Sequence, residues 1–386
     1  MLLELQGRHL RPITATSRES FIGRICEQTE PCPSTSGREI FLQRTPSETL
    51  PPGYRAYLLC HDAPATSEHR DVYRLARPMH YLAHEDVVRL DPQRGAIYAL
   101  YRRTSSYNSL LVTEQCDNYC VMCSQPPKAK DDAWLLDELR QIVPLISPET
   151  QELGITGGEP ALLGEGLVEL LQLLEQHLPR TAIHVLSNGR RFSRADFARG
   201  VAKVGHPDLV FGIPLYSDVP EDHDYVVQAR GAFSETIRGI LNLKRYRVGV
   251  EIRFVVHTET YRRLPDFARF LARNLLFADH VAIMGLELMG FARANLDALW
   301  IDPIDYQGQL VEAVTTLHRA GMAVSIYNHP LCLLDPSLHG FARKSISDWK
   351  NTYLETCNAC ARKSDCGGFF ASSSLRRSRG VRPQMS

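Results

Sequence analysis

The sequence contains neither a long apolar run nor an excess of charge of either sign. A helix needs about 18 consecutive apolar residues to cross a bilayer, so we expect no transmembrane segment and no membrane partner. Lys and Arg total 44, and Asp and Glu also total 44. Because long polyanions are bound through a basic excess, this balance argues against a nucleic acid as an obligatory partner. Glu4 interrupts the first apolar residues, so we expect no secretory signal.

Cysteine, by contrast, is abundant. The 386 residues include ten cysteines, and 44% of the chain is hydrophobic, enough for a sizeable core. Without a visible signal sequence, a reducing compartment is expected, and the cytoplasm is the default. In that setting clustered thiols bind metal or carry redox chemistry more often than they form cross-links.

The first hundred residues are irregular in pattern. We interpret residues 30–53 as a loop or linker, because Pro, Gly, Ser and Thr are concentrated there. Residues 86–90 and 96–101 are short β-rich stretches separated by a Pro-Gln-Arg-Gly turn, which is typical of a hairpin. We therefore expect a small β-rich N-terminal module over residues 1–105.

From about residue 108 the pattern changes to alternating strands and helices. The expected strands are 109–113, 153–156, 183–187, 209–213, 250–256 and 281–286. The expected helices lie around 133–143, 166–178, 195–204, 233–244, 264–276 and 304–320. Parallel strands need helical crossovers, so this alternation predicts an α/β fold, a partial (β/α)6 TIM-like barrel. We assign the barrel core to residues 106–303, and a cysteine-bearing segment with a basic, solvated tail to residues 304–386.

Three cysteines follow the first barrel strand within eight residues. Cys116, Cys120 and Cys123 have the spacing Cys-x3-Cys-x2-Cys. Iron–sulfur clusters normally take four cysteines, so three would leave one iron open, as in a catalytic metal site. The position of this loop after a barrel strand also fits a catalytic site, because loops at the carboxyl ends of barrel strands carry the chemistry. A zinc site with a fourth ligand from elsewhere, or three unrelated thiols, remains the alternative.

Two polar turns follow later strands. Gly157 and Gly158 would let a ligand approach the backbone closely, and Glu159 can accept a hydrogen bond from an ammonium group. Ser187 and Asn188 offer hydroxyl and amide groups suited to a ribose or a carboxylate.

A further pair of polar residues lies on the fifth strand. Glu251 and Arg253 alternate with apolar residues, so both point to the same face. Arg253 is a candidate ligand contact or, alternatively, one half of a buried ion pair with Glu251. We assign no catalytic acid or base, because the acidic residues after the fourth strand are ordinary solvated loop residues without further geometry.

Taken together, these motifs resemble the radical S-adenosylmethionine (SAM) superfamily, whose members cleave SAM to a 5′-deoxyadenosyl radical that abstracts a hydrogen atom. The resemblance implies that Cys116, Cys120 and Cys123 bind a [4Fe–4S] cluster whose open iron chelates SAM. Gly158 and Glu159 would hold the SAM amino group, and Ser187 and Arg253 would contact its ribose or carboxylate. The complete set of implied cofactor contacts is Gly157, Gly158, Glu159, Ser187, Asn188 and Arg253. An electron donor such as flavodoxin or ferredoxin is implied as a partner.

A second group of cysteines lies near the C-terminus. Cys357, Cys360 and Cys366 have the spacing Cys-x2-Cys-x5-Cys, and Cys332 lies upstream. Four thiolates suit either zinc or a [4Fe–4S] cluster, and spacing does not separate the two. The run resembles the auxiliary-cluster segments called SPASM or twitch domains, and it matches the shorter, one-cluster twitch type. Cys332 is the candidate fourth ligand; an exogenous ligand on an open iron is the alternative.

The residues around both cysteine groups resemble one family within this superfamily more specifically. Leu-Leu-Val-Thr-Glu-Gln-Cys through Cys-Ser-Gln-Pro-Pro-Lys, with Cys-Gly-Gly-Phe-Phe-Ala-Ser near the C-terminus, resembles the His-Xaa-Ser system radical SAM maturase family. The resemblance runs from about residue 86 to residue 374. It implies hydrogen abstraction from a peptide, with a small His-Xaa-Ser repeat protein as the suspected substrate. The alternatives are a radical SAM enzyme acting on a small molecule in cofactor biosynthesis, and a non-catalytic metal-binding scaffold.

Overall fold

The protein folds into two compact units in the computed structural model, which describes residues 5–14, 17–27, 37–46, 49–62, 71–344 and 351–384. The first unit comprises Met1–Leu110, Leu136–Leu153 and Gln176–Thr181; the second comprises Leu111–Leu135, Gly154–Glu175 and Ala182–Ser386. None of the helices within the described ranges has the length and apolar character needed to cross a bilayer.

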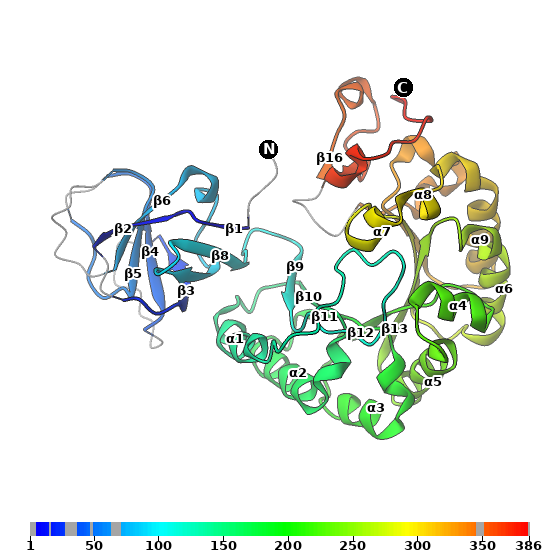
Figure 1. The fold of residues 1–386 in the computed structure, drawn as a ribbon, viewed down its shortest axis with the longest axis horizontal. Helices are drawn as coiled ribbons and strands as arrows, with labels where there is room; N and C mark the ends of the chain where they lie inside the picture. Colours follow the sequence, from blue (N-terminus) through cyan, green and yellow to red (C-terminus); the bar gives the residue numbers. More distant parts are fainter. Residues whose placement is uncertain are drawn as a thin grey trace. The chain divides into compact units, whose positions relative to one another are not determined.

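An eight-stranded sheet forms most of the first unit (Figure 1). Its strands are β1 (Gln6–Gly7), β2 (Leu10–Thr14), β3 (Phe21–Cys26), β4 (Glu39–Gln43), β5 (Ala56–Leu59), β6 (Val72–Leu75), β7 (Val87–Asp91) and β8 (Ala96–Tyr101). The order is β1-β8-β7-β3-β4-β5-β6-β2. The hairpin expected over 86–101 is confirmed, because β7 and β8 pair antiparallel.

The loop expected over residues 30–53 is wrong in part. β4 lies within it and is buried along its whole length, because Ile40, Phe41 and Leu42 pack into the apolar cores of this unit. The flanking prolines favoured a loop prediction, although the strand itself is a short apolar run. Residues 28–36 and 47–48 of the expected loop lie outside the described residues.

A second, parallel sheet carries the site described below. Its strands are β9 (Asn108–Leu111), β10 (Glu152–Thr156), β11 (Ala182–Leu186), β12 (Leu209–Pro214), β13 (Gly249–Val256), β14 (His280–Gly285) and β15 (Val324–Tyr327), in the order β15-β14-β13-β12-β11-β10-β9. All six expected strands are present to within two residues at either end. β15 is an additional seventh strand that pairs parallel with β14.

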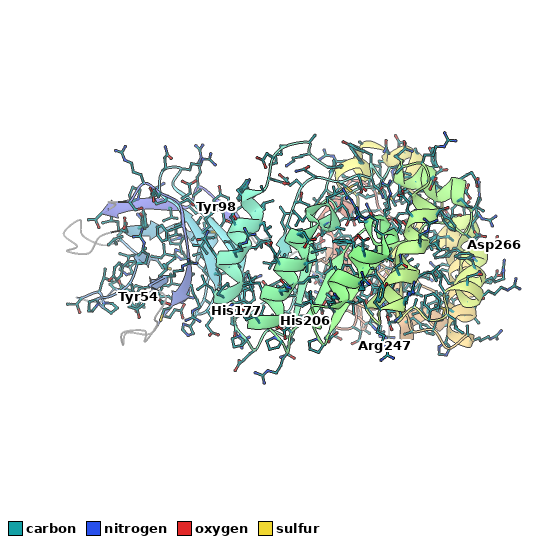
Figure 2. All side chains as sticks on the ribbon, turned by 90° about the horizontal axis from the view of Figure 1, so that it is seen from below. Tyr54, Tyr98, His177, His206, Arg247 and Asp266 are labelled. Atoms are coloured by element: carbon teal, nitrogen blue, oxygen red, sulfur yellow. The ribbon has the colours of Figure 1, made fainter. Side chains whose placement is uncertain are left out.

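Helices follow the strands; most of them cover the outer face of the sheet, and the two shortest pack beside residues 120–122 (Figure 1). They are α1 (Trp134–Ile142), α2 (Glu165–His177), α3 (Ala195–Ala202), α4 (Pro220–Val227), α5 (Ala232–Arg245), α6 (Leu264–Asn274), α7 (Gly290–Ala294), α8 (Leu296–Leu299) and α9 (Gln307–Arg319). The loops that lead back into the strands, marked by His206 and Arg247, lie along one edge (Figure 2). The loops that leave the strands gather at the opposite, carboxyl edge, where a parallel barrel places its chemistry.

Candidate cofactor site at the carboxyl edge of the sheet

The loop that carries the first three cysteines, residues 112–133, is closed at its base by one buried carboxylate. Asp132 accepts hydrogen bonds from the Thr113 hydroxyl (3.0 Å), the Glu114 backbone N–H (2.5 Å) and the Gln115 side-chain amide (3.1 Å). These bonds return the end of the loop to its beginning. Nothing in the local sequence pattern distinguishes Asp132 from a solvated acidic residue, so its role is visible only in the structure.

The far side of the same loop is held by backbone hydrogen bonds. The Tyr119 N–H donates to the Val227 carbonyl at the end of α4 (3.1 Å), and the Phe291 N–H in α7 donates to the Cys123 carbonyl (2.8 Å). The loop is therefore attached to elements that follow β12 and β14, and its conformation does not depend on its own residues alone.

Three partly exposed thiols lie together on this loop. Burial raises the pKa of Cys116 to about 12, and the neighbouring Glu159 carboxylate, Asp117 and Cys123 act in the same direction. Burial also raises the pKa of Cys120, and the other two thiols of the group add to that effect. Thiols this close favour their protonated form unless a cation lies among them. The donor set therefore fits a positively charged iron cluster.

The two glycines of the Gly-Gly-Glu turn make room for the cysteine loop. A Cβ on Gly157 would lie 2.5 Å from the Thr113 carbonyl oxygen, and a Cβ on Gly158 would lie 2.1 Å from that of Gln115. The Gly158 N–H donates to Thr113 (2.8 Å) and the Glu159 N–H donates to Gln115 (2.8 Å). The close approach expected from adjacent glycines is present, and the chain segment immediately before Cys116 is what approaches them.

The side chain of Glu159, the expected contact of a cofactor ammonium group, is fully buried in this structure. Its carboxylate accepts from the Ala161 N–H (2.8 Å), the Ser187 hydroxyl (2.7 Å) and the Asn188 N–H (2.5 Å). Burial raises the pKa of Glu159 to about 7, although these three hydrogen bonds stabilise its ionised form. Glu159 therefore joins the turn after β10 to the turn after β11.

Arg190 links that second turn to the cysteine loop. Its guanidinium donates to the Asp117 carbonyl (2.8 Å), the Asn118 side chain (2.7 Å) and the Glu235 carboxylate (2.7 Å). Asn188 also donates from its side-chain amide to the Asp117 carboxylate (2.6 Å). Arg190 was not predicted as a site residue, although a cation directly after the Ser-Asn-Gly turn was an available signal.

Arg253 forms the ion pair that the sequence left open as the alternative. It donates to Glu251 (2.8 Å) and contacts the Met284 sulfur (3.2 Å). Burial alone would raise the pKa of Glu251, but the hydrogen bond from His280 and the charges of Arg253 and His184 hold it at about 2. Arg253 is thus anchored on the inner face of the sheet.

The four C-terminal cysteines line a single pocket. Cys332, Cys357, Cys360 and Cys366 all contribute to its wall. The segment between them is closed by a two-stranded ladder of β16 (Asn351–Thr352) and β17 (Phe369–Phe370). Backbone N–H groups already point at two of the sulfurs, from Leu331 and Gly368 to Cys366 and from Gln384 to Cys360, each at 3.4 Å. This arrangement fits a group held by thiolates.

Within the described ranges, no three or more His, Cys, Asp or Glu side chains are arranged to hold a single metal ion.

The basic tail is not the solvated end that its composition predicted. Asp302 accepts from the Arg379 N–H (3.0 Å) and from the Ser378 hydroxyl, and Arg379 also pairs with Asp305. Further along, the Gln384 carbonyl accepts from the backbone of the cysteine segment (2.9 Å). Acidic residues distant in sequence anchor the tail through Arg376 and Arg379, which a pattern confined to the tail's own residues could not reveal.

We predict that Arg190→Gln loosens the cysteine loop. The substitution removes hydrogen bonds from a mostly buried cation to three partners, so the free energy of unfolding should fall by about 1.5–3 kcal/mol. Urea unfolding measures the change, and limited proteolysis should cut faster within residues 112–133. The matched control is Arg191→Gln, an exposed neighbour that should stay within about 0.5 kcal/mol of the parent. Equal effects of the two substitutions would contradict the role given to Arg190.

Glu159→Gln should destabilise the junction between the two turns. Three donors meet the carboxylate, so an amide nitrogen in its place would oppose a donor, at a cost of about 1–3 kcal/mol. The shift in thermal unfolding tests this. As the control, Glu165→Gln changes an exposed acid at the start of α2 and should cost less than about 1 kcal/mol. An unchanged midpoint for Glu159→Gln would show that the carboxylate does not hold the junction.

Comparison with known proteins agrees with this geometry. Residues 110–271 match the family model described as the radical SAM superfamily. A GTP 3′,8-cyclase of Mesorhizobium japonicum is 34% identical over 112 residues, covering 27% of this chain and 33% of that protein. A GTP 3′,8-cyclase of Desulforamulus reducens is 26% identical over 204 residues, covering 50% and 59%. The chain thus spans between a third and three fifths of the length of these relatives.

Among solved structures, SuiB of Streptococcus suis bound to S-adenosylmethionine matches with a TM-score of 0.45 and 15% identity, over 56% of this chain and 49% of that one. The family match coincides with the strands and loops that carry the cysteine loop and both polar turns. The chain therefore contains a radical SAM domain.

Proposed function

We propose that this protein is a radical SAM enzyme in which Cys116, Cys120 and Cys123 hold a [4Fe–4S] cluster. The observation that carries the proposal is the bracing of one three-thiol loop by both polar turns at the carboxyl edge of a parallel sheet. A solvated, unbraced loop would not keep three thiols together. A purely structural metal site would have no need of an open ligand position.

The bound cluster and SAM would supply an electron transfer that yields methionine and a 5′-deoxyadenosyl radical, which takes a hydrogen atom from the substrate. The chain's own residues orient the reactants. The Ser187 hydroxyl donates a hydrogen bond to the Glu159 carboxylate. We therefore assign binding of the SAM amino group to the backbone of Gly157 and Gly158. Arg253, already paired with Glu251, would contact SAM only by its remaining donors.

We further propose that Cys332, Cys357, Cys360 and Cys366 hold an auxiliary [4Fe–4S] cluster. The shared pocket and the N–H groups directed at Cys360 and Cys366 support this, because such hydrogen bonds stabilise thiolates. Such a cluster could accept one electron from the substrate radical as that radical is oxidised to product, or it could bind the substrate.

A peptide is the substrate that we favour, with a His-Xaa-Ser repeat protein as the suspected partner. The sequence around the two cysteine groups, from Leu110 to Lys128 and after Cys366, supports it. A flavodoxin or ferredoxin would supply the electron.

A small-molecule substrate is the second candidate. It is favoured by the sequence similarity to proteins named GTP 3′,8-cyclase, which extends over half of this chain in one case. Incubation of the reconstituted protein with SAM, reductant and either GTP or a His-Xaa-Ser repeat peptide distinguishes the two. We expect a mass change in the peptide and none in GTP, measured by mass spectrometry; the reverse result would favour the second candidate.

Replacement of Cys116, Cys120 and Cys123 by Ala should remove about four iron atoms per chain and abolish 5′-deoxyadenosine formation, because a [4Fe–4S] cluster depends on its thiolates. Iron analysis and chromatography of the products measure both. Cys60→Ala, outside both groups, is the control and should retain both properties. Persistent SAM cleavage in the triple variant would refute the proposed function.

Single Ala replacements of Cys357, Cys360 and Cys366 should each remove the second cluster and leave uncoupled SAM cleavage measurable, because the first three thiols lie on a different loop. Iron analysis should give about eight atoms in the parent and about four in each variant. One tightly held zinc ion with only four iron atoms in the parent would instead indicate a structural zinc site.

A further inference from the structure

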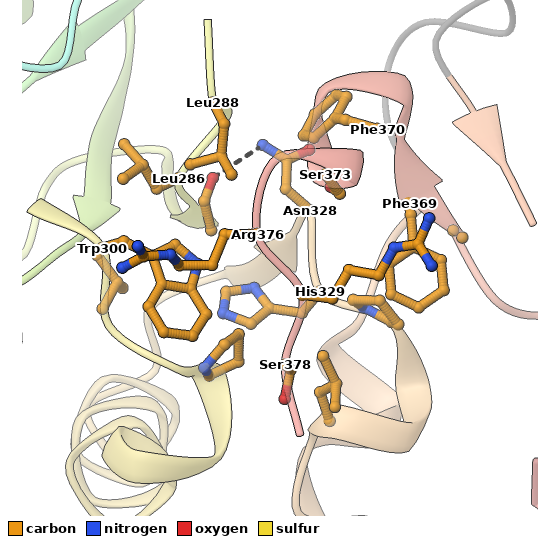
Figure 3. Close-up of a pocket in the computed structure, with 18 of the residues that line it drawn as sticks. Leu286, Leu288, Trp300, Asn328, His329, Phe369, Phe370, Ser373, Arg376 and Ser378 are labelled. Atoms are coloured by element: carbon orange, nitrogen blue, oxygen red, sulfur yellow. Dashed lines mark hydrogen bonds between the residues drawn. The ribbon is translucent and has the colours of Figure 1, made fainter. Parts of the chain in front are cut away.

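A pocket that is partly open to solvent lies where β13, β14 and β15 end and where residues 367–378 pass over them. Figure 3 shows side chains from both parts facing this space, among them Leu286, Trp300 and His329 from the barrel and Phe369 from the C-terminal segment.

The lining of the pocket is apolar and aromatic with a positive rim. Among the described residues that line it are Arg376 and Arg377 but no Asp or Glu. Arg376 is already engaged, because its guanidinium lies 5.3 Å from the Trp300 ring centre and donates to Asp297 (2.7 Å) (Figure 3). Arg377 is exposed and has no ion pair or hydrogen bond within the part of the chain that the structure describes. An unneutralised arginine beside a pocket suits a carboxylate or a phosphate.

The floor of the pocket contains a buried histidine that is hydrogen-bonded and uncharged. His329 accepts from the Tyr306 hydroxyl (2.7 Å) through Nε2, because its Nδ1 donates to the Tyr327 carbonyl (2.8 Å). Burial lowers the pKa of His329 to about 4, so the ring is neutral near pH 7. The floor therefore offers no second positive charge, and an anion would be attracted to the rim.

The pocket also adjoins the C-terminal cysteines. Pro330 and Phe369 line both this pocket and the one that contains the four thiols. A molecule held here would lie next to the auxiliary group on one side and at the carboxyl edge of the barrel on the other.

We propose that this pocket seats the substrate by an anionic group, a carboxylate or a phosphate, which Arg377 binds while the apolar or planar remainder packs against Trp300 and Phe369. The inference rests on the proposed function, because it concerns the substrate of the same enzyme. The tail that carries Arg377 is fixed by Asp302, so the guanidinium is presented from an anchored segment and not from a free end.

The test uses the full-length reconstituted chain, as parent, Arg377→Gln and Arg273→Gln. Arg273 is an exposed arginine of α6 on the outside of the sheet and is the matched control. Isothermal titration measures the binding of GTP and of a peptide of His-Xaa-Ser repeats with Asp at Xaa, together with the same peptide carrying Asn. Uncoupled SAM cleavage is measured in parallel.

We expect the parent to bind at least one anionic probe. Arg377→Gln should weaken that binding by about 10- to 150-fold, because one charge-assisted hydrogen bond is lost. The Asn peptide should bind the parent more weakly than the Asp peptide and lose nothing further in Arg377→Gln. Arg273→Gln should match the parent throughout.

Binding by Arg377→Gln equal to that of the parent, or no binding of either anionic probe by the parent, would overturn the inference. SAM cleavage should be equal in the parent and in Arg273→Gln. If the parent does not cleave SAM, the proposed function fails instead, and the titrations still decide the pocket.

Discussion

The hydrogen bonds to the buried Glu159 carboxylate hold together the ends of two neighbouring strands, and the rest of the site depends on them. The carboxylate accepts from Ser187 and Asn188 after β11, while its own backbone N–H binds Gln115 beside the first cysteine. A buried carboxylate without donors would cost several kcal/mol, about what is lost when a buried charge is left unpaired, so these three donors are a requirement of the fold. Arg190 then extends the junction to the tip of the cysteine loop.

The two cysteine groups are held in different ways. The first lies on a loop attached to the ends of strands and helices of a packed barrel. Three of the four thiols of the second group lie in residues 351–384, where no described hydrophobic side chain is fully buried, and a two-stranded ladder and the anchored tail close the loop. Segments with few buried apolar contacts open easily, so ligation of the four thiols would supply folding free energy to this part of the chain.

Hydrophobic periodicity was sufficient to predict six parallel strands and the six helices that cover them, because burial of one face imposes it on the sequence. It missed β15, which has only four residues, and α4, whose acidic first turn resembled a solvated loop. It also missed β4, where flanking prolines outweighed a short apolar run. Each of these elements is short, and over so few residues a hydrophobic pattern does not differ clearly from that of a turn.

The sequence by itself determined the residue types and the order of the site: three closely spaced thiols, then a Gly-Gly-Glu turn, then a Ser-Asn-Gly turn, each after a strand. Only the tertiary structure decided which groups meet. The glycines admit the backbone before Cys116, the carboxylate of Glu159 is turned inward, and the basic tail is fixed on Asp302. Local spacing specifies which donors and acceptors exist. Their partners come from strands far apart in the chain, and packing of the sheet sets the distances between them.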